Sequence, residues 1–335
     1  MFDLLDVLKD ANTIGITGHA RPDGDCVGST MAMYMYLTKN YPEKRIDIFL
    51  EPIPESYGQI ARLDEVSTDF VTEVEKYDAF VVIDCEYTRT GQAQSLFENA
   101  NLKLNVDHHI SNKGCGDINY IVPSASSACE LVYDLIGEER LDDDIALALY
   151  LGMIHDTGVF QYSNTSPKTL RTAAKLIEFK FDFSTIIEES FYQKTYMQNL
   201  LLGKAVNESV LILDGHAIYS VVSKELMKEY NAKSSDLEGI VNQLRNTKGV
   251  DCAIFMYEVE EGEYKVSLRS NDNVNVSEIA KSFGGGGHVK AAGVTMNGTD
   301  KEIVSKLSDS IREQLKLLKA KAFGSFFERN NTRQL

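Results

Sequence analysis

Short apolar runs alternate with helical patterns through the first half of the chain. The runs predict buried strands because they are short, rich in β-branched residues and bounded by turn formers. The predicted strands are Thr13–Thr17, Ile46–Leu50, Ala79–Asp84 and Leu102–Val106. Between them, apolar residues recur at helical spacing in Val27–Thr38 and Gln92–Asn99. Strands that alternate with helices are typical of an α/β fold built on a parallel sheet.

From residue 126 onward the pattern becomes helical. Helices are expected at Ser126–Gly137, Asp142–His155 and Pro167–Lys180. The last of these has Ser166 as its N-cap and a proline at its first helical position, where proline is favoured. Phe181–Val206 lacks strong apolar alternation, so we expect helices or a linker there.

A smaller α+β pattern occupies the rest of the chain. The predicted strands are Ser209–Leu213, Ala217–Val222, Cys252–Glu258 and Tyr264–Arg269, and the predicted helices are Ser235–Asn246, Val276–Phe283 and Asp300–Lys321. We therefore expect a larger domain over residues 1–187, a helical linker over 188–207, a smaller domain over 208–322 and a C-terminal tail over 323–335.

Composition narrows the class of protein. A chain of 335 residues with 43% hydrophobic residues can bury a sizeable core, which excludes a disordered or fibrous protein. The net charge of −16 excludes a protein that coats DNA through a broad basic surface. Five cysteines at irregular spacing favour reduced thiols in the cytoplasm. The uncharged stretch Ile145–Ile154 is too short to span a membrane, and Met1–Asp10 is too acidic for a signal peptide.

Acidic residues and histidines follow several of the predicted elements. They are His19, Asp23 and Asp25 after the first strand, Asp84 at the end of the third, Asp107, His108 and His109 after the fourth, and Asp156 at a helix end. For the loop with Asp23 and Asp25 alone, a polar turn with a capping Asp explains the residues equally well. Ligand sites in open α/β sheets lie beyond the carboxyl ends of the strands, so we expect the whole set to converge there.

So many like charges at one place would make folding costly without a cation. Mixed oxygen and imidazole donors suit Mn²⁺ or Mg²⁺, or else Fe or Co, better than a structural zinc. The candidate ligands exceed one octahedral shell, which favours two cations. A pair about 3.5–4 Å apart binds the attacking and leaving oxygens of a displacement at phosphorus. The sequence therefore predicts phosphoester hydrolysis.

Four stretches resemble, in order and spacing, the four motifs of the DHH phosphoesterase superfamily. They are Gly18-His19 with Asp23-Gly24-Asp25 and Gly28-Ser29, the strand-end Asp84, Asp107-His108-His109, and Asp156-Thr157-Gly158. In the second half, Leu268-Arg269-Ser270 and Gly284-Gly285-Gly286-Gly287-His288, followed by Ala291-Ala292-Gly293, resemble the DHHA1 domain of the same enzymes. Within the superfamily, the chain is most similar to the branch of bifunctional oligoribonucleases and pAp phosphatases.

The resemblance implies a DHH catalytic domain over 1–187 and a DHHA1 substrate-binding domain over 208–322, with a cleft between them. It implies one metal on His19, Asp23 and Asp84, and a second on Asp25, Asp84, His108 and Asp156, with Asp84 bridging and Mn²⁺ as the expected ion. It also implies that Asp107 orients the neighbouring histidines, that His109 faces the substrate phosphate, and that metal-activated water is the nucleophile.

The glycine run at residues 284–287 is not a Walker A loop, because no Gly-Lys-Ser/Thr follows it. Four glycines before an expected helix let backbone N–H groups converge on an anion. With the resemblance, the expected clamp for the uncut part of the substrate consists of Arg269, Ser270, Gly285, Gly286, Gly287 and His288. Lys290 is a weaker candidate for the same task.

Three residues near the motifs stay open. Glu86 lies where relatives often carry another acid, so it either replaces that acid or is simply solvated. His155 precedes a candidate ligand and either touches the substrate or packs at the helix end. His216 follows an expected Asp214-Gly215 turn and has the character of a surface histidine.

The expected substrates are RNAs of two to five nucleotides, linear dinucleotides such as pApA or pGpG, and 3′-phosphoadenosine 5′-phosphate (pAp). Long duplex nucleic acid and membranes are not expected partners, and a homodimer is expected because relatives often dimerise. A cyclic-dinucleotide (c-di-AMP) phosphodiesterase is the alternative within the same chemistry. A RecJ-type exonuclease is disfavoured because extra nucleic-acid-binding domains are absent, and a family II pyrophosphatase is disfavoured by the glycine run. A non-catalytic nucleotide-binding module would be marked by the loss of a metal ligand, but every expected ligand is present.

Overall fold

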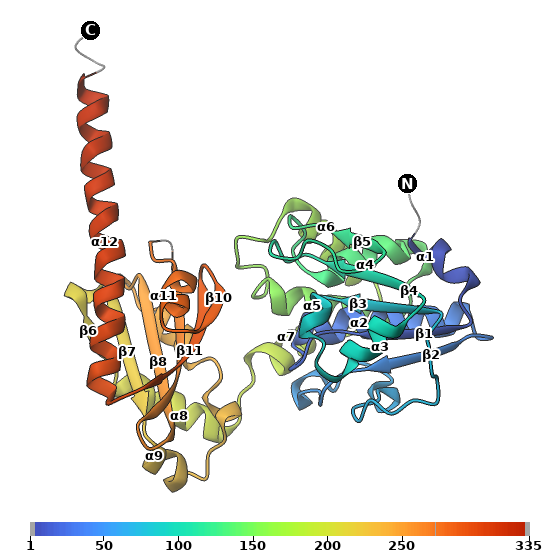
Figure 1. The fold of residues 1–335 in the computed structure, drawn as a ribbon, viewed down its shortest axis with the longest axis horizontal. Coiled ribbons are helices and arrows are strands. Elements are labelled where there is room, and N and C mark those ends of the chain that lie inside the picture. The colour runs from blue at the N-terminus through green and yellow to red at the C-terminus, as the bar shows by residue number, and fades with distance from the viewer. Residues whose placement is uncertain (1–3, 272, 332–335) are drawn as a thin grey trace. The chain divides into compact units, whose positions relative to one another are not determined.

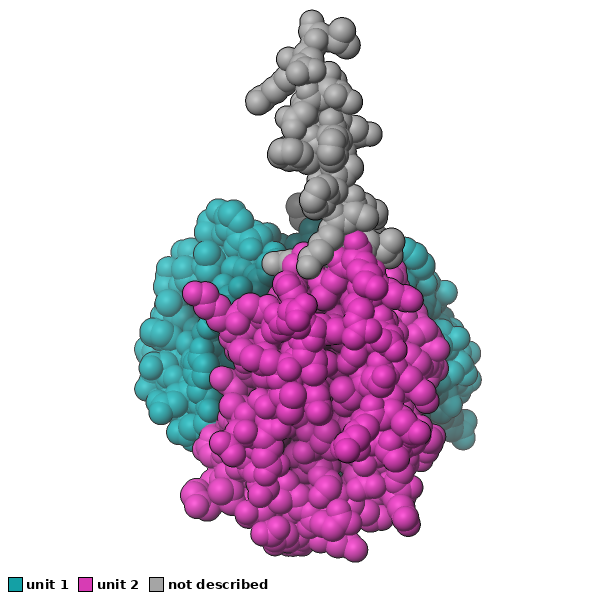
Figure 2. All heavy atoms as spheres, turned by 90° about the vertical axis from the view of Figure 1, so that its left-hand side faces the viewer, with its two compact units in different colours: residues 1–193 teal, residues 194–335 magenta. Residues whose placement is uncertain are grey.

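The computed structural model describes residues 4–271 and 273–331 of the chain (Figure 1). The chain divides into two compact units, Met1–Gln193 and Lys194–Leu335 (Figure 2). The division lies within the segment 188–207 that the sequence pattern assigns to a linker.

A five-stranded parallel sheet forms the centre of the first unit, in the order β2-β1-β3-β4-β5 (Figure 1). The strands are β1 (Thr13–Thr17), β2 (Arg45–Phe49), β3 (Ala79–Ile83), β4 (Leu102–Asp107) and β5 (Ile118–Ile121). The first four strands agree with the predicted ones to within one residue at each end. β5 was not predicted, because it is a short edge strand whose side chains are only partly buried and form no continuous apolar run.

Helices cover both faces of this sheet. They are α1 (Leu4–Val7), α2 (Gly24–Asn40), α3 (Gln94–Asn99), α4 (Ala128–Ile136), α5 (Asp143–Asp156), α6 (Pro167–Leu176) and α7 (Phe183–Ile187). The largest core joins α2, α4 and α5 to one face. On the other face, Phe80 and Val82 of β3 pack with Phe97 of α3. A sheet that is buried on both faces needs nearly continuous apolar strands, which is the pattern seen in the sequence.

Two glycines allow α2 to pack closely against α5. A Cβ atom on Gly28 of α2 would lie 2.3 Å from the backbone oxygen of Ala148 of α5, and one on Gly152 of α5 would lie 3.0 Å from the backbone oxygen of Gly24 at the start of α2. Any larger side chain would therefore separate the helices. Because α2 begins directly after the loop with His19 and Asp23, this contact also sets the place of that loop.

A six-stranded sheet forms the second unit, in the order β10-β11-β9-β8-β7-β6 (Figure 1). The strands are β6 (Val210–Ile212), β7 (Ala217–Val222), β8 (Cys252–Glu260), β9 (Glu263–Ser270), β10 (Gly286–His288) and β11 (Ala291–Asn297). β7 and β8 are parallel, and the other neighbours are antiparallel. The helix expected after the glycine run is wrong. β11 occupies that place, because side chains from Ala291 to Asn297 alternate between buried and more exposed, the period of a strand.

Helices also lie on both faces of the second sheet. They are α8 (Tyr196–Asn207), α9 (Lys224–Glu229), α10 (Ile240–Arg245), α11 (Val276–Ser282) and α12 (Asp300–Asn331). One core contains residues of α11 and α12, and another contains residues of α8 and α10. α12 continues into the predicted tail at 323–335, of which residues 332–335 lie outside the described residues.

All five cysteines carry free thiols, as the irregular spacing predicted. Among the described helices, none combines the length and the apolar character needed to cross a membrane.

Candidate metal centre

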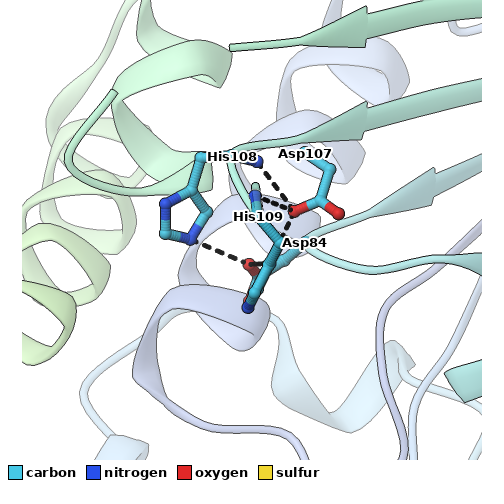
Figure 3. Close-up of side chains that lie close together, drawn as sticks. All are labelled: Asp84, Asp107, His108 and His109. Carbon is cyan, nitrogen blue, oxygen red and sulfur yellow. Dashed lines mark hydrogen bonds and ion pairs between the residues drawn. The ribbon is translucent and has the colours of Figure 1, made fainter. Parts of the chain in front are cut away.

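The carboxyl ends of three adjacent strands carry the candidate ligands. β1, β3 and β4 are neighbours in a parallel sheet, so the loops that follow them meet at one edge. The loop after β1 supplies His19 and Asp23, β3 is followed by Asp84, and β4 is followed by His108. Asp156 ends α5 and joins the same cluster. Figure 3 shows the part of the cluster that β3 and β4 supply.

His19 faces two carboxylates. Its Nε2 atom lies 3.6 Å from Asp23 Oδ1 and 3.5 Å from Asp84 Oδ2. Its other ring nitrogen, Nδ1, lies 3.0 Å from the backbone oxygen of Ala20. A ring that donates its Nδ1–H to this carbonyl has its lone pair on Nε2, directed at the carboxylates. The separations exceed the usual 2.7–3.2 Å or so of a hydrogen bond, so these groups surround a common point rather than pair directly.

His108 faces three carboxylates in the same way. Its Nε2 atom lies 3.7 Å from Asp25 Oδ2, 3.4 Å from Asp84 Oδ1 and 3.6 Å from Asp156 Oδ2. The residues that supply these atoms come from α2, from the end of β3 and from the end of α5. The structure therefore brings together the residues of the second predicted ligand group.

Asp84 belongs to both groups. Its Oδ2 faces His19, its Oδ1 faces His108, and the residue is 2% exposed. Its Oδ1 is buried and accepts no hydrogen bond from the described part of the chain. Its backbone φ is 66°, a left-handed conformation that side-chain-bearing residues adopt rarely. A strained backbone and an unsatisfied buried acceptor in one residue mark a functional position.

Asp25 is held by the start of α4. Asp25 Oδ2 accepts a hydrogen bond of 2.6 Å from the N–H of Ala128, and Oδ1 accepts one of 2.9 Å from the N–H of Cys129. The partial positive charge at a helix N-terminus favours an anion there. Since Asp25 is only 1% exposed, these two bonds fix both the position and the orientation of its carboxylate.

The charges of the cluster shift one another's pKa values. Burial, together with the charge of Asp84, raises the pKa of Asp25 to about 7. Burial and the charge of Asp25 raise the pKa of Asp156 well above its ordinary value. Burial would lower the pKa of His108, but Asp84 and Asp25 raise it to about 10. Burial would also lower the pKa of His19, but its carboxylate neighbours raise it well above its ordinary value. In this cluster, bound protons would therefore compete with a metal cation for the same carboxylate and imidazole groups.

The donor chemistry fits a divalent metal ion. Three groups of side chains have donor atoms within 4.8 Å of one another: Asp84, Asp107, His108 and His109; His19, Cys26 and Asp84; and Asp25, His108 and Asp156. Cys26 is an unsuitable ligand, because burial raises the pKa of its thiol to about 11 and a metal binds the thiolate. The remaining oxygen and imidazole donors, with the unsatisfied oxygen of Asp84 between them, can hold a metal ion.

Asp107 contacts the histidines through hydrogen bonds (Figure 3). Its Oδ1 accepts bonds from the N–H of His108 at 2.7 Å, from the N–H of His109 at 3.0 Å and from His109 Nδ1 at 2.7 Å. Burial would raise the pKa of Asp107, but the neighbouring His109 holds it below its ordinary value. Asp107 therefore contacts the ring of His109, and a role for it in catalysis stays a prediction.

Three asparagines near the cluster were not found from the sequence. Asn112 Nδ2 donates to Asp107 Oδ2 at 2.6 Å and to Asn105 Oδ1 at 2.9 Å. Asn105 Nδ2 in turn donates to the backbone oxygens of Val82 and Cys85, on either side of Asp84. The third is Asn164, which contacts Asp156. Asn105 and Asn164 also contact segments 20 or more residues away, which no local sequence pattern marks.

His155 packs among aromatic rings beside Gly24, the residue between Asp23 and Asp25. Its ring meets the rings of Tyr57 and Phe191 edge-on at 5.0 and 5.4 Å, and its Nε2 lies 3.1 Å from Ser190 Oγ. Burial lowers its pKa to about 4. The helix-end packing role is therefore the one that its contacts support. Glu86 is half-buried and lies outside the ligand groups found among the described residues.

In the second unit, Arg269 and His288 share one face of the sheet. Arg269 of β9 pairs with Ala291 of β11, and Ala291 pairs with His288 of β10. Residues in register across a sheet point to the same face. Arg269 Nε donates to Asn242 Oδ1 of α10 at 3.2 Å, and Arg269 Nη1 donates to the backbone oxygen of Leu268. Arg269 and His288, two of the predicted clamp residues, therefore lie on either side of Ala291 on the same face of the sheet.

Ser270 does not reach that face. It is fully buried, and its Oγ donates to the backbone oxygen of Val289. The N–H groups of Gly284 and Gly285 donate to the carbonyls of Lys281 and Ala280, which ends α11. Gly284 and Gly285 thus follow a helix rather than precede one, and their N–H groups bind its last carbonyls. Anion binding at Gly286 and Gly287 stays a prediction. His216 lies 2.7 Å from Asp251 and has no place in either site.

Comparisons with known proteins agree with this arrangement. The DHH family N-terminal domain matches residues 13–153, and the DHHA1 domain matches residues 214–317. A Streptococcus mutans protein named "Probable bifunctional oligoribonuclease and PAP phosphatase NrnA" is 30% identical over 296 residues, covering 87% of this chain and 91% of its own. The Bacillus subtilis protein named bifunctional oligoribonuclease and PAP phosphatase NrnA is 29% identical over 304 residues, covering 89% of this chain and 94% of its own.

Solved structures share the fold. An exopolyphosphatase-related protein from Bacteroides fragilis superposes with a TM-score of 0.87 at 24% identity, over 94% of this chain and 96% of its own. RecJ from Thermus thermophilus, solved in complex with Mn²⁺, gives a TM-score of 0.54 at 14% identity, over 93% of this chain and 53% of its own. With the parallel sheet, the second mixed sheet and the ligand motifs in order, the chain belongs to the DHH–DHHA1 family of phosphoesterases, among the relatives of NrnA.

Proposed function

We propose that this protein is a metal-dependent phosphodiesterase and phosphatase. It hydrolyses short oligoribonucleotides and linear dinucleotides such as pApA to mononucleotides, and pAp to AMP. The relatives that match most of the chain carry both activities in their names. The single structural observation that carries the proposal is Asp84, whose two oxygens face two separate groups of ligands.

Two divalent cations would occupy the centre. His19, Asp23 and Asp84 would hold one, and Asp25, Asp84, His108 and Asp156 would hold the other. Oxygen and imidazole donors favour Mn²⁺, with Mg²⁺ or Co²⁺ as substitutes. The complex of Thermus thermophilus RecJ with Mn²⁺, which has the same fold, is consistent with that choice. When bound, such a pair supplies Lewis-acid polarisation of the phosphoryl group and a water of lowered pKa.

His109 and Asp107 would act on the substrate phosphate. Asp107 Oδ1, 2.7 Å from His109 Nδ1, holds a proton at that nitrogen and fixes the plane of the ring. With Nδ1 held in this way, the second ring nitrogen, Nε2, would contact a phosphate oxygen. Asp107 itself is fully buried, which suits orientation of the ring and not contact with the substrate.

The face with Arg269 and His288 would bind the part of the substrate that is not cut. The guanidinium of Arg269 suits two-point contact with a phosphate, and Asn242 holds its Nε in place. A Cβ atom on Gly286 would meet nothing within 4 Å, so the surface beside His288 leaves room for a ligand. Gly285, Gly287 and Ser270 would support this surface through the backbone.

Local positive charge explains how a chain with a net charge of −16 takes an anionic substrate. Cations, Arg269 and the histidines act over short distances, while the acidic remainder repels a long polyanion. This favours substrates of a few nucleotides over long duplexes. Homodimer formation and a place in the cytoplasm stay predictions from the sequence.

A substrate panel tests the proposal. Metal-stripped full-length protein is supplied with Mn²⁺ and assayed on RNAs of increasing length, pAp, pApA, cyclic di-AMP and pyrophosphate. We expect release of mononucleotides from the shortest RNAs and from pApA, release of phosphate from pAp, and loss of both with a chelator. Turnover of cyclic di-AMP or pyrophosphate alone would contradict the proposal and support the corresponding alternative.

A further inference from the structure

The loop after α5 returns to the metal centre through Asn164. Its Nδ2 atom lies 3.1 Å from the backbone oxygen of Asp156 and 3.4 Å from Asp156 Oδ2. The same Nδ2 donates to the backbone oxygen of Ser126 at 2.8 Å. Asn164 Oδ1 is buried and accepts no hydrogen bond from the residues that the structure describes. One amide therefore joins the end of α5 to the segment that leads into α4.

The backbone of this loop is strained. Gly158, Val159 and Phe160 have φ values of 56°, 54° and 65°, three successive left-handed residues. This conformation is unfavourable for a residue with a side chain and persists only where other contacts enforce it. Two such contacts are the N–H of Val159 to the oxygen of Ile154 at 2.7 Å and the N–H of Phe160 to Thr157 Oγ1 at 3.0 Å. The tight turn brings Asn164 back to Asp156.

The other partner of Asn164 is itself anchored. Ser126 Oγ donates to Glu130 Oε2 at 2.6 Å, and Glu130 is 2% exposed. Thr169 Oγ1 donates to the same oxygen at 2.8 Å. The next residues of the segment, Ala128 and Cys129, provide the two N–H groups that hold Asp25. Through Ser126, Asn164 therefore contacts the segment that fixes one carboxylate facing His108, while it contacts the other carboxylate, Asp156, directly.

We propose that Asn164 is a positioning residue for the half of the metal centre around His108. It holds Asp156 at a set distance from Asp25, so that both carboxylates reach one cation. This inference rests on the proposed two-cation centre. Partners that orient metal ligands contribute about 10–100-fold in metal affinity. The effect is confined to the group of Asp25, His108 and Asp156, because the Asn164 amide donates to Ser126 and Asp156 and, within the described residues, not to His19 or Asp23.

Mn²⁺ titration of metal-stripped protein, followed by electron paramagnetic resonance of the free ion, tests the inference without an activity assay. The wild type should bind two equivalents. Asn164→Ala should weaken one of them about 10–100-fold and leave the other unchanged. Asn99→Ala is the matched control, since Asn99 is exposed and its Nδ2 also caps a backbone oxygen, that of Glu75. It should bind as the wild type does. If Asn164→Ala does not fold, Asn164→Ser, which keeps one donor in the loop, replaces it.

Double variants identify the affected half. Asp156→Ala should abolish binding of the same Mn²⁺ equivalent, so the double variant Asp156→Ala with Asn164→Ala should lose no further Mn²⁺ binding. In the double variant Asp23→Ala with Asn164→Ala, the losses in Mn²⁺ binding should add. Folded Asn164 variants that bind two Mn²⁺ with wild-type affinities would overturn the inference and leave the proposed function standing. A wild type that binds fewer than two would overturn both.

Discussion

Asp84 is the residue at which the two halves of the metal centre meet. Its left-handed backbone turns the carboxylate away from the line of β3, so that each oxygen faces a different histidine. Neither feature stabilises the fold, since the conformation is strained and a buried acceptor without a donor is unfavourable. Both features of Asp84 are what the proposed role as a shared metal ligand requires.

Asp25 makes the stability of the metal-free protein depend on pH. Burial and the charge of Asp84 raise its pKa to about 7, from 3.8 in the unfolded chain. Between these values the folded protein keeps a proton that the unfolded chain has released, so stability falls as pH rises through this window. His108, with its pKa raised to about 10, must also lose a proton to bind a metal. Mn²⁺ takes the place of these protons.

We therefore expect the rise in Tm on adding excess Mn²⁺ to be larger at pH 8 than at pH 5. Thermal melts of chelator-treated protein, with and without Mn²⁺ at each pH, measure it. A rise at pH 5 that equals or exceeds the rise at pH 8 would argue against Asp25 and His108 as ligands.

The ligand candidates could be predicted because each stands at the end of a strand or helix that the apolar pattern marks. Parallel strands place those ends together, so the positions of these residues in the sequence were enough to predict that they converge. Asn105 and Asn164 could not be predicted, because each acts through a partner that only the tertiary fold brings near. The role of Asp107 was available only from the resemblance to a known family.

At the scale of elements, the contact between α2 and α5 sets the place of the ligand loop. Gly28 lies where a Cβ would be 2.3 Å from a backbone oxygen, which has little freedom to move. We expect Gly28→Ala to lower the free energy of unfolding by about 1–3 kcal/mol, the usual cost of overpacking. Because α2 carries Asp25, we also expect weaker Mn²⁺ binding.

Gly203→Ala is the matched control for Gly28→Ala. Gly203 lies in α8, and a Cβ there would meet nothing within 4 Å. Alanine is the better helix former, so this change should raise the free energy of unfolding by about 0.5–1 kcal/mol. Urea unfolding of both variants measures the difference. Equal effects from the two substitutions would contradict the close packing of α2 and α5.

The secondary structure of the glycine run could not be predicted from the sequence pattern. Four glycines have no side chains to display a period, so the pattern gave no sign that residues 286–288 form a strand. Gly284 and Gly285 end α11, and β10 pairs with β11 through the backbone. β5 was missed for a related reason, because partial burial leaves its residues Ile118–Ile121 without a clear pattern.

At the scale of the whole molecule, the two units contribute different tasks. The first unit contains the candidate metal ligands, and the second presents Arg269. Hydrogen bonds to charged groups contribute about 1.5–3 kcal/mol, so we expect Arg269→Ala to lower kcat/KM for pApA roughly 10–100-fold. Hydrolysis of an aryl phosphate ester, which has no second nucleotide, should change little.

Lys265→Ala is the control for that experiment. Lys265 lies on the same strand and carries the same charge, but it is exposed and contacts Thr295 at a distance from Arg269. It should leave both substrates unaffected. Equal losses on pApA and on the aryl ester in Arg269→Ala would contradict a nucleotide-binding face in the second unit.

The most direct test of the central claim is the Mn²⁺-dependent hydrolysis of pApA by the wild type and by Asp84→Asn. A metal cation contributes several kcal/mol to such a reaction, so loss of the shared ligand should lower kcat on the order of a thousandfold or more. Circular dichroism should find both proteins folded. We predict that the wild type is active only with the metal and that Asp84→Asn stays inactive with it; a folded Asp84→Asn variant with near wild-type turnover would contradict the two-metal account.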